Sequence, residues 1–301
     1  MTKRNATKSS LTPRPGDLTS PHRVPTSLLA PLLACALLAA STPPQDGDRQ
    51  PLSPCAAENT AFLPGEDLLY DLYFQWKFIW VKAGTAHYHV SQTPDGHLRT
   101  DLLFAGSKRL NAVFPMKDTL VSEATADLTP LYFRKGATEG KHYTVDEVFY
   151  TYPQGRSHVQ QRFLNRHGQW SEHTHESAEC NYDMLSILNA ARSFDASAYE
   201  QGHRIHFPMA TGKRVEEQTL VYKGLKDFKA NDGNTYRCLV FSLLDYDTKD
   251  REKELLRFYV TDDANHLPVR IDFYLRFGIA KAYYQGGTGI RHPQEAIIPK
   301  K

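Results

Sequence analysis

Large apolar and aromatic side chains occupy every second position from residue 68 to residue 80. They are Leu68, Tyr70, Leu72, Phe74, Trp76, Phe78 and Trp80. The positions between them include the polar residues Asp71, Gln75 and Lys77. Residues two apart point to the same face of a β-strand, so this period predicts a strand or hairpin with one apolar and one polar face. We expect residues 65–90 to form the first hairpin of an antiparallel sheet with one face in water.

Turn sequences separate further runs of alternating residues. They lie at residues 93–96, 153–155, 166–168 and 231–234. Proline presets φ, and glycine or asparagine accepts positive φ, which suits hairpin turns. The clearest run has apolar positions from Leu256 to Val260 and, after a turn, from Val269 to Phe277. Several short strands with turns between them indicate a mainly β fold, either a large curved antiparallel sheet or a partly closed barrel.

One segment has a helical period instead. Its apolar residues Met184, Leu185, Leu188 and Ala191 recur at helical spacing, and Asn181 or Asp183 can cap its start. The pattern predicts one short helix around residues 183–192, of about three turns. Such a helix could plug one end of a curved sheet or cover its open edge.

The first 41 residues have the layout of a secretory signal. A basic segment precedes an apolar run at 28–40, and small residues allow cleavage after Ala40 or Ser41. Residues 32–35 also resemble a bacterial lipobox, and cleavage there would make Cys35 a lipidated N-terminus. Because the apolar run continues past Cys35, a discarded signal is the simpler interpretation. We expect export to the periplasm or to the outer membrane.

Composition narrows the function of the remaining chain. Residues 1–41 hold five of the 36 basic and one of the 34 acidic residues, which leaves 31 basic and 33 acidic residues and a net charge of −2. A near-neutral chain lacks the basic surface of a nucleic-acid-binding protein. No later run reaches the about 18 apolar residues of a membrane span. We expect a Pro-rich linker at 42–63, a single β domain at 64–285 and a flexible tail at 286–301.

Three cysteines follow the predicted signal: Cys55, Cys180 and Cys238. An odd number in an oxidising compartment allows one disulfide and one free thiol, or no disulfide. We favour Cys180–Cys238, because both lie inside the predicted domain and Cys55 lies in the predicted linker. The other two pairings and the reduced state stay open.

Candidate chemistry is sparse. His87 and His89 share one strand face, and His173 and His175 repeat this spacing, so the four imidazoles are weak candidates for a zinc or copper site. They are more simply residues of a wet face, and we expect no metal and no cofactor. The motifs of nucleophilic catalysis are missing, and no two carboxylates are paired by the sequence, so no catalytic residue is assigned.

The aromatic run is the best candidate for a binding surface. Trp76, Phe78 and Trp80 lie late in it, where a hairpin tip or sheet rim would expose them. A curved sheet with more aromatic surface than one helix can cover would leave an apolar groove for a ligand. The simpler interpretation is that this face is the core of the domain.

Several scattered motifs resemble a known family. The first two motifs are Gly65-Glu66-x-Leu68-x-Tyr70-Asp71 and residues 82–86, Lys-Ala-Gly-Thr-Ala. The middle of the chain adds residues 183–186, Asp-Met-Leu-Ser, followed by Arg192 and by Gly202 before a strand. The last two are residues 259–263, Tyr-Val-Thr-Asp-Asp, and residues 267–269, Leu-Pro-Val. Over about residues 62–285 the chain is similar to the exported bacterial domain of unknown function 3108. The resemblance implies a secreted or periplasmic, mostly antiparallel β protein, and it carries over no catalytic residue. It also suggests a fold similar to the curved half-barrel of lipoprotein carriers, which hold acyl chains in a concave sheet.

These observations favour a non-catalytic envelope protein that holds a hydrophobic or amphipathic ligand, or a partner, in a concave sheet. A lipid-like molecule and an envelope polymer are the expected ligand classes. The alternatives are a periplasmic hydrolase acting on an envelope polymer and a purely structural scaffold. An apolar cavity of roughly 300 Å3 would favour the binder, and convergent carboxylates of perturbed pKa would favour the hydrolase.

Overall fold

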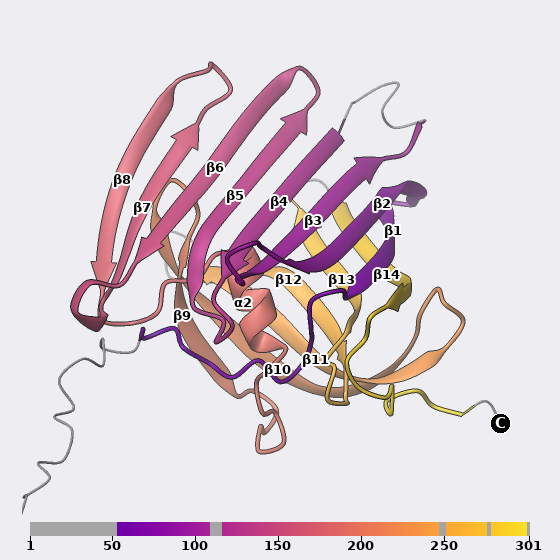
Figure 1. Ribbon diagram of the computed structural model, residues 1–301. Coiled ribbons are helices and arrows are strands. Elements are labelled where there is room, and N and C mark those ends of the chain that lie inside the picture. Colours follow the sequence, from indigo (N-terminus) through magenta and orange to yellow (C-terminus); the bar gives the residue numbers. More distant parts are fainter. Residues whose placement is uncertain (1–52, 109–115, 247–250, 276–277, 300–301) are drawn as a thin grey trace, which may run out of the picture. The chain divides into compact units, whose positions relative to one another are not determined.

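The computed structural model describes residues 53–108, 116–246, 251–275 and 278–299, and the predicted signal with Cys35 lies outside them. Within these residues one antiparallel sheet of fourteen strands dominates the fold (Figure 1). The strands are β1 (Asp67–Trp76), β2 (Ile79–Gln92), β3 (Leu98–Gly106), β4 (Met116–Ala124), β5 (Pro130–Glu139), β6 (His142–Thr151), β7 (Ser157–Leu164), β8 (Trp170–Ser177), β9 (Arg204–Ala210), β10 (Val215–Lys229), β11 (Thr235–Tyr246), β12 (Glu252–Thr261), β13 (Pro268–Leu275) and β14 (Gly278–Thr288).

The strand order joins two meanders at the middle of the sheet. It runs from β8 back to β1, then through β14 back to β9, so that the first and last strands of the chain are neighbours. Tyr70 of β1 faces Ala86 of β2 on one side and Tyr284 of β14 on the other. The strands β8 and β9 are the two ends of this order, so the sheet curves without closing. The predicted fold class, a large curved antiparallel sheet with one short helix, is confirmed.

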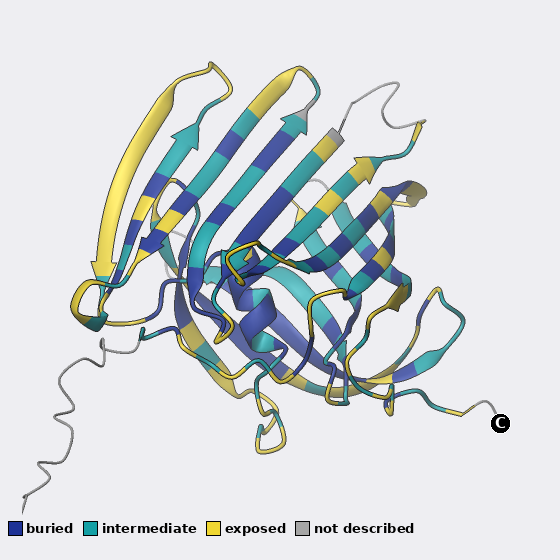
Figure 2. Ribbon diagram, viewed as in Figure 1, coloured by how far each residue is buried: buried dark blue, intermediate teal, exposed yellow. Residues whose placement is uncertain are grey.

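The helix α2 (Met184–Ala191) lies on the concave side of the sheet, in the connection from β8 to β9 (Figure 1). It is shorter than predicted. Asp183 is its N-cap: the carboxylate accepts hydrogen bonds from the backbone N–H groups of Leu185 and Ser186, and the Ser186 side chain completes a capping box. Most of the helix is buried (Figure 2). The residue before the cap, Tyr182, exchanges backbone hydrogen bonds with β9 and so covers part of that edge.

The four turns predicted from the sequence all lie between consecutive strands of the structure. The predicted turns at 93–96, 166–168 and 231–234 connect β2 to β3, β7 to β8 and β10 to β11. The fourth, at 153–155, is the short 3-10 helix η1 (Pro153–Gly155) between β6 and β7. Each of these four connections therefore lies where turn-forming residues interrupt the apolar period.

The first hairpin divides the predicted apolar face. β1 ends at Trp76, Lys77 adopts a positive φ of 52° in the turn, and β2 begins at Ile79. Trp80 therefore pairs with Gln75 and shares its face of the sheet. The prediction that all seven alternating residues share one face is wrong beyond the turn. Where the chain reverses, the alternation does not continue in phase, so Trp80 points to the face opposite Leu72 and Phe74.

Segments expected to be a linker and a flexible tail contribute to the core. Ala61 and Phe62 are fully buried within the predicted linker. The predicted tail begins inside β14, and its residue Ala296 is 1% exposed while Ile297 forms a bridge with Tyr236. The described parts of both segments thus pack on the domain, because a few apolar residues in polar surroundings gain free energy by burial.

The disulfide joins Cys55 to Cys180, and Cys238 is a buried free thiol. The prediction of a Cys180–Cys238 bond is wrong. Cys238 lies in the middle of β11, where its side chain packs in the main core, while the buried Cys55 lies beside the segment that leads into α2. The predicted linker packs on the domain instead, and this places Cys55 within bonding distance of Cys180.

Candidate functional site

An apolar pocket opens on the concave side of the sheet, above α2. Its walls come from β1, β2 and β3 on one side and from β13 and β14 on the other, and its free volume is about 40 Å3. Its lining residues are Leu68, Tyr70, Ala86, Tyr88, Leu102, Phe104, Leu188, Arg192, Pro268, Ile271, Phe273 and Ala282. Leu188 and Arg192 are contributed by α2 and its C-cap, so the helix forms the floor.

Strand alternation explains why these residues meet. Leu68, Tyr70 and Leu72 point to the concave side and are buried, as are Ala86 and Tyr88 on the neighbouring strand. Other lining side chains, such as Phe104, are only half-buried. The pocket is therefore the part of the concave apolar face that α2 leaves uncovered.

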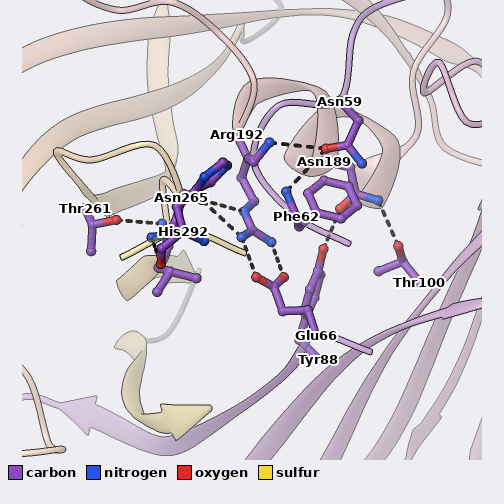
Figure 3. Close-up of polar contacts among 12 residues, drawn as sticks. Asn59, Phe62, Glu66, Tyr88, Thr100, Asn189, Arg192, Thr261, Asn265 and His292 are labelled. Atoms are coloured by element: carbon purple, nitrogen blue, oxygen red, sulfur yellow. Dashed lines mark hydrogen bonds and ion pairs between the residues drawn. The ribbon is translucent and has the colours of Figure 1, made fainter. Parts of the chain in front are cut away.

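Polar contacts hold the helix in place against this apolar face. Tyr88 donates a hydrogen bond of 2.7 Å to Asn189 Oδ1, and Asn189 Nδ2 donates one of 2.9 Å to Thr100 (Figure 3). All three side chains are buried. Since a buried amide without partners would cost free energy, Asn189 specifies where α2 docks on β2 and β3.

A buried ion pair lies at the C-terminal end of the helix. The Arg192 guanidinium donates two hydrogen bonds to the Glu66 carboxylate, of 2.5 and 2.8 Å (Figure 3). It also donates two to the Asn265 carbonyl, of 3.1 and 3.2 Å. The exposed fractions are 2% for the Arg192 side chain and 0% for Glu66. One side chain thereby joins the segment before β1, the helix and the turn between β12 and β13.

Burial and the ion pair set the electrostatics of the pocket floor. Burial by itself would lower the pKa of Arg192, but hydrogen bonding and attraction from Glu66 outweigh it and raise that pKa. Burial raises the pKa of Tyr88 to about 12, and it also raises that of Tyr70. The floor is thus a neutral phenol surface over a compensated ion pair, which offers no net charge to a ligand.

A second buried carboxyl lies at the start of the helix. Burial raises the pKa of Asp183 to about 6, although hydrogen bonds from Ser186, Leu185 and Tyr150 act in the opposite direction. Its oxygens accept the N-terminal N–H groups of α2 and a hydrogen bond of 3.2 Å from Tyr150. This group is a helix cap, and it does not line the pocket.

Of the aromatic residues predicted to bind a ligand, Phe78 and Trp80 do not line the pocket. Phe78 lies in the hairpin turn after β1 and is 93% exposed. Trp80 is on the opposite face of the sheet, where its ring stacks on Tyr73 at 5.3 Å between centroids. Trp76 is the last residue of β1. The pocket is built from the earlier members of the same period, Leu68 and Tyr70, together with residues of distant strands.

The two predicted histidine pairs lie far apart in the sheet. His87 and His89 are on β2, and His173 and His175 are on β8, with five strands between them in the strand order. The pairs therefore cannot form one site. The structure instead brings Asp67 of β1 to His87 and His89, a carboxylate that the strand pattern did not single out.

Three carboxylates lie at a second hollow of about 220 Å3. It is lined by Asp195, Ala196, Ser197, Leu239, Asp262, Asp263, Ala264 and His266. Hydrogen bonds from Ser197 lower the pKa of Asp195, and Asp262 forms an ion pair with Arg237. A general acid needs a raised pKa, and the pKa of Asp195 is shifted in the opposite direction.

Both the sequence and the fold of this chain are similar to known families and structures. The sequence model of a protein family of unknown function, DUF3108, matches residues 69–285. A crystal structure of a beta-barrel-like protein of the domain of unknown function DUF1849 from Brucella abortus has a TM-score of 0.50 at 12% identity and covers 77% of this chain and 99% of its own; the similarity shows a shared fold. Another solved structure, a candidate exported protein with a YmcC-like fold from Bacteroides fragilis, has a TM-score of 0.29 at 10% identity over 77% of this chain and 99% of its own.

Other comparisons add little. None of the curated proteins matches this chain. Among the described residues no helix has the length and apolar character needed to cross a bilayer. The family match covers well over half of the sequence and includes the strands that form the pocket walls. The chain belongs to the DUF3108 family.

Proposed function

We propose that this protein is exported to the bacterial envelope and binds the apolar chain of an amphipathic, lipid-like ligand on the concave side of its sheet. The observation that carries the proposal is the lining of the pocket. Apart from the compensated Arg192, every lining residue is apolar or a neutral phenol. A surface of this kind stabilises hydrocarbon by removing it from water, and it offers little to a polar polymer.

Access to the pocket is from the end of the sheet away from α2. The free volume of about 40 Å3 holds only a few water molecules, and small-molecule sites have roughly 300 Å3 or more. A ligand must therefore separate the half-buried side chains of the two walls. Because β3 and β13 belong to different halves of an open sheet and are not paired with each other, they can move apart without breaking a strand pair.

Exposed apolar residues mark this end of the sheet. Phe78 and Ile79 lie at the β1–β2 turn, with exposed fractions of 93% and 42%, and Leu275 ends the neighbouring β13 hairpin arm with 53%. Side chains of this type lower the cost of contact with a lipid surface or with a partner that delivers the ligand. Phe78, which the sequence predicted as a ligand contact, is assigned here to docking at the rim.

Export rests on the N-terminal sequence. A basic segment, a short apolar run and small residues precede the domain, as in secretory signals. The disulfide Cys55–Cys180 is consistent with an oxidising compartment such as the periplasm. Cleavage after Ala40 or Ser41, or lipidation at Cys35, decides whether the protein is free or anchored to a membrane.

The test is native mass spectrometry of the protein purified from its own envelope, before and after organic extraction. We expect a bound lipid-like mass that disappears on extraction. Phe104→Gln, which places an amide on the pocket wall, should lose the bound mass. Leu103→Gln is the matched control, because Leu103 is the preceding residue of the same strand and is 41% exposed on the other face.

Two outcomes overturn the proposal. A clean apo mass for the wild-type protein would favour a scaffold, which the small free volume also suits. Equal loss of ligand in Phe104→Gln and Leu103→Gln would place binding outside the pocket.

A further inference from the structure

Asp67, His87 and His89 form a compact cluster on the convex face of β1 and β2. Asp67 is the cross-strand partner of His89, and His87 lies two residues further along the same face. His87 Nε2 lies 2.7 Å from both carboxylate oxygens of Asp67, and His89 Nδ1 lies 3.2 Å from Asp67 Oδ2. The three ligand atoms all lie within 4.8 Å of one another. No other three such atoms from His, Cys, Asp or Glu converge in this way among the described residues.

One nitrogen of the cluster makes no hydrogen bond within the described part of the chain. The His89 side chain is 39% exposed, yet its Nδ1 atom is buried and makes no hydrogen bond to the described residues. The separation from Asp67 Oδ2 is short, so the buried lone pair or N–H faces the carboxylate without the geometry of a hydrogen bond. A buried ring nitrogen that faces a carboxylate and a second imidazole has the arrangement of a metal ligand.

The geometry points to a site for a divalent transition metal, with Zn2+ as the best fit. We propose that Asp67, His87 and His89 bind this ion through one carboxylate oxygen and two imidazole nitrogens. In a tetrahedral zinc site with bonds of about 2.0 to 2.1 Å, neighbouring ligand atoms lie about 3.3 Å apart. The two distances to Asp67 Oδ2, 2.7 and 3.2 Å, reach that value with small side-chain rotations.

The chemistry of the ligands requires one proton shift. His87 Nε2 must present its lone pair, so its ring proton moves to Nδ1 when the metal replaces the hydrogen bond to Asp67. Asp67 and both histidines are partly exposed, with fractions of 32% and 39%, so water can supply the fourth ligand. Asp101, the neighbour of His89 on β3, is bound by Arg99 at 3.0 Å and stays outside the proposed ligand set.

The second histidine pair supplies a matched control. His173 and His175 have the same spacing on β8, but their register partners on β7 are Gln161 and Val159. Two imidazoles without a carboxylate lack the third protein ligand of an open zinc site. The proposal therefore predicts that metal binding depends on one histidine pair and is independent of the other.

The experiment is calorimetric titration of the untagged protein with Zn2+, together with thermal unfolding with and without the ion. We expect one saturable site, and a Tm that rises because Zn2+ binds the folded hairpin. His87→Ala and Asp67→Asn should each weaken binding at least about tenfold, since a lost ligand costs no less than a lost outer-shell partner. The double variant His173→Ala/His175→Ala should bind as the wild type does.

Two further measurements separate loss of metal binding from loss of the fold. Circular dichroism checks that each variant is folded, and the visible absorption of bound Co2+ reports tetrahedral coordination in the wild type and its loss in Asp67→Asn. The proposal is overturned if the wild type shows no saturable binding at micromolar Zn2+. It is equally overturned if Asp67→Asn binds normally or if the His173/His175 variant loses the site.

Discussion

Breaking the Glu66–Arg192 ion pair should destabilise the protein strongly, and removing both charges should restore part of the loss. Both side chains are essentially inaccessible to water, and two hydrogen bonds join them. Glu66→Gln or Arg192→Met leaves one buried charge without its partner. Such a change costs about 3 to 5 kcal/mol of unfolding free energy, because the remaining charge keeps its desolvation penalty.

The double variant Glu66→Gln/Arg192→Met carries no buried charge, but it is not neutral. Arg192 also donates both hydrogen bonds to the Asn265 carbonyl, and an unsatisfied buried carbonyl costs about 1 to 3 kcal/mol. We therefore expect the double variant to lose clearly less than the sum of the single variants. The coupling energy between the two positions should be at least about 3 kcal/mol.

Urea denaturation with the disulfide intact measures these differences, with equal m-values as the check that unfolding stays comparable. The exposed pair Arg156–Glu176, with exposed fractions of 46% and 50%, is the control. Arg156→Met should cost no more than about 1 kcal/mol. Additive single losses at Glu66 and Arg192, or losses as small as that of the control, would refute the reasoning from burial.

Three further outcomes follow from the buried groups. Replacing Cys55 and Cys180 by Ala should cost about 2 to 5 kcal/mol in urea denaturation, because the bond closes a loop with a sequence separation of 125; an unchanged midpoint would contradict a formed disulfide. Burial raises the pKa of Cys238 to about 12, so peptide mapping should find this thiol unlabelled by Ellman reagent at pH 8 until the protein is denatured. Because the pKa of Asp183 is raised from 3.8 to about 6, the folded state binds its proton more tightly, and stability should fall by about 2 kcal/mol as pH rises from 4 to 7. Asp183→Asn keeps a helix cap and should flatten this profile, whereas a profile as steep as that of the wild type would assign the dependence to other groups.

Local sequence patterns predicted much of the secondary structure. The alternation from Leu68 to Phe74 indicates a strand with one apolar face, and these residues do lie on the concave side. The cap at Asp183 and the turn-forming residues at 93–96 and 231–234 also lie where the structure has a helix start and two hairpin turns. These predictions hold because each depends on residues a few positions apart.

The limits of that pattern are visible at one turn. Beyond Trp76 the alternation continues in the sequence, but the chain reverses and Trp80 is on the other face. The apolar residues on both sides of the turn hide it, since no glycine or proline marks the reversal. Phe78 therefore lies in the turn and Trp80 beyond it, while Leu68 and Tyr70 of the preceding strand line the pocket.

Periods of 2 and 3.6 in the sequence are enough to predict the class of fold, its hairpins and the capped helix, because backbone geometry turns them into local structure. Folding of the whole domain was needed to pair β1 with β14, to join Cys55 to Cys180, and to bring Glu66 to Arg192 across 126 positions of the chain. It also brought Asp67 to the two histidines of β2. Contacts of this kind depend on which arrangement buries the most apolar surface with its polar groups satisfied, and that free energy is a property of the whole domain.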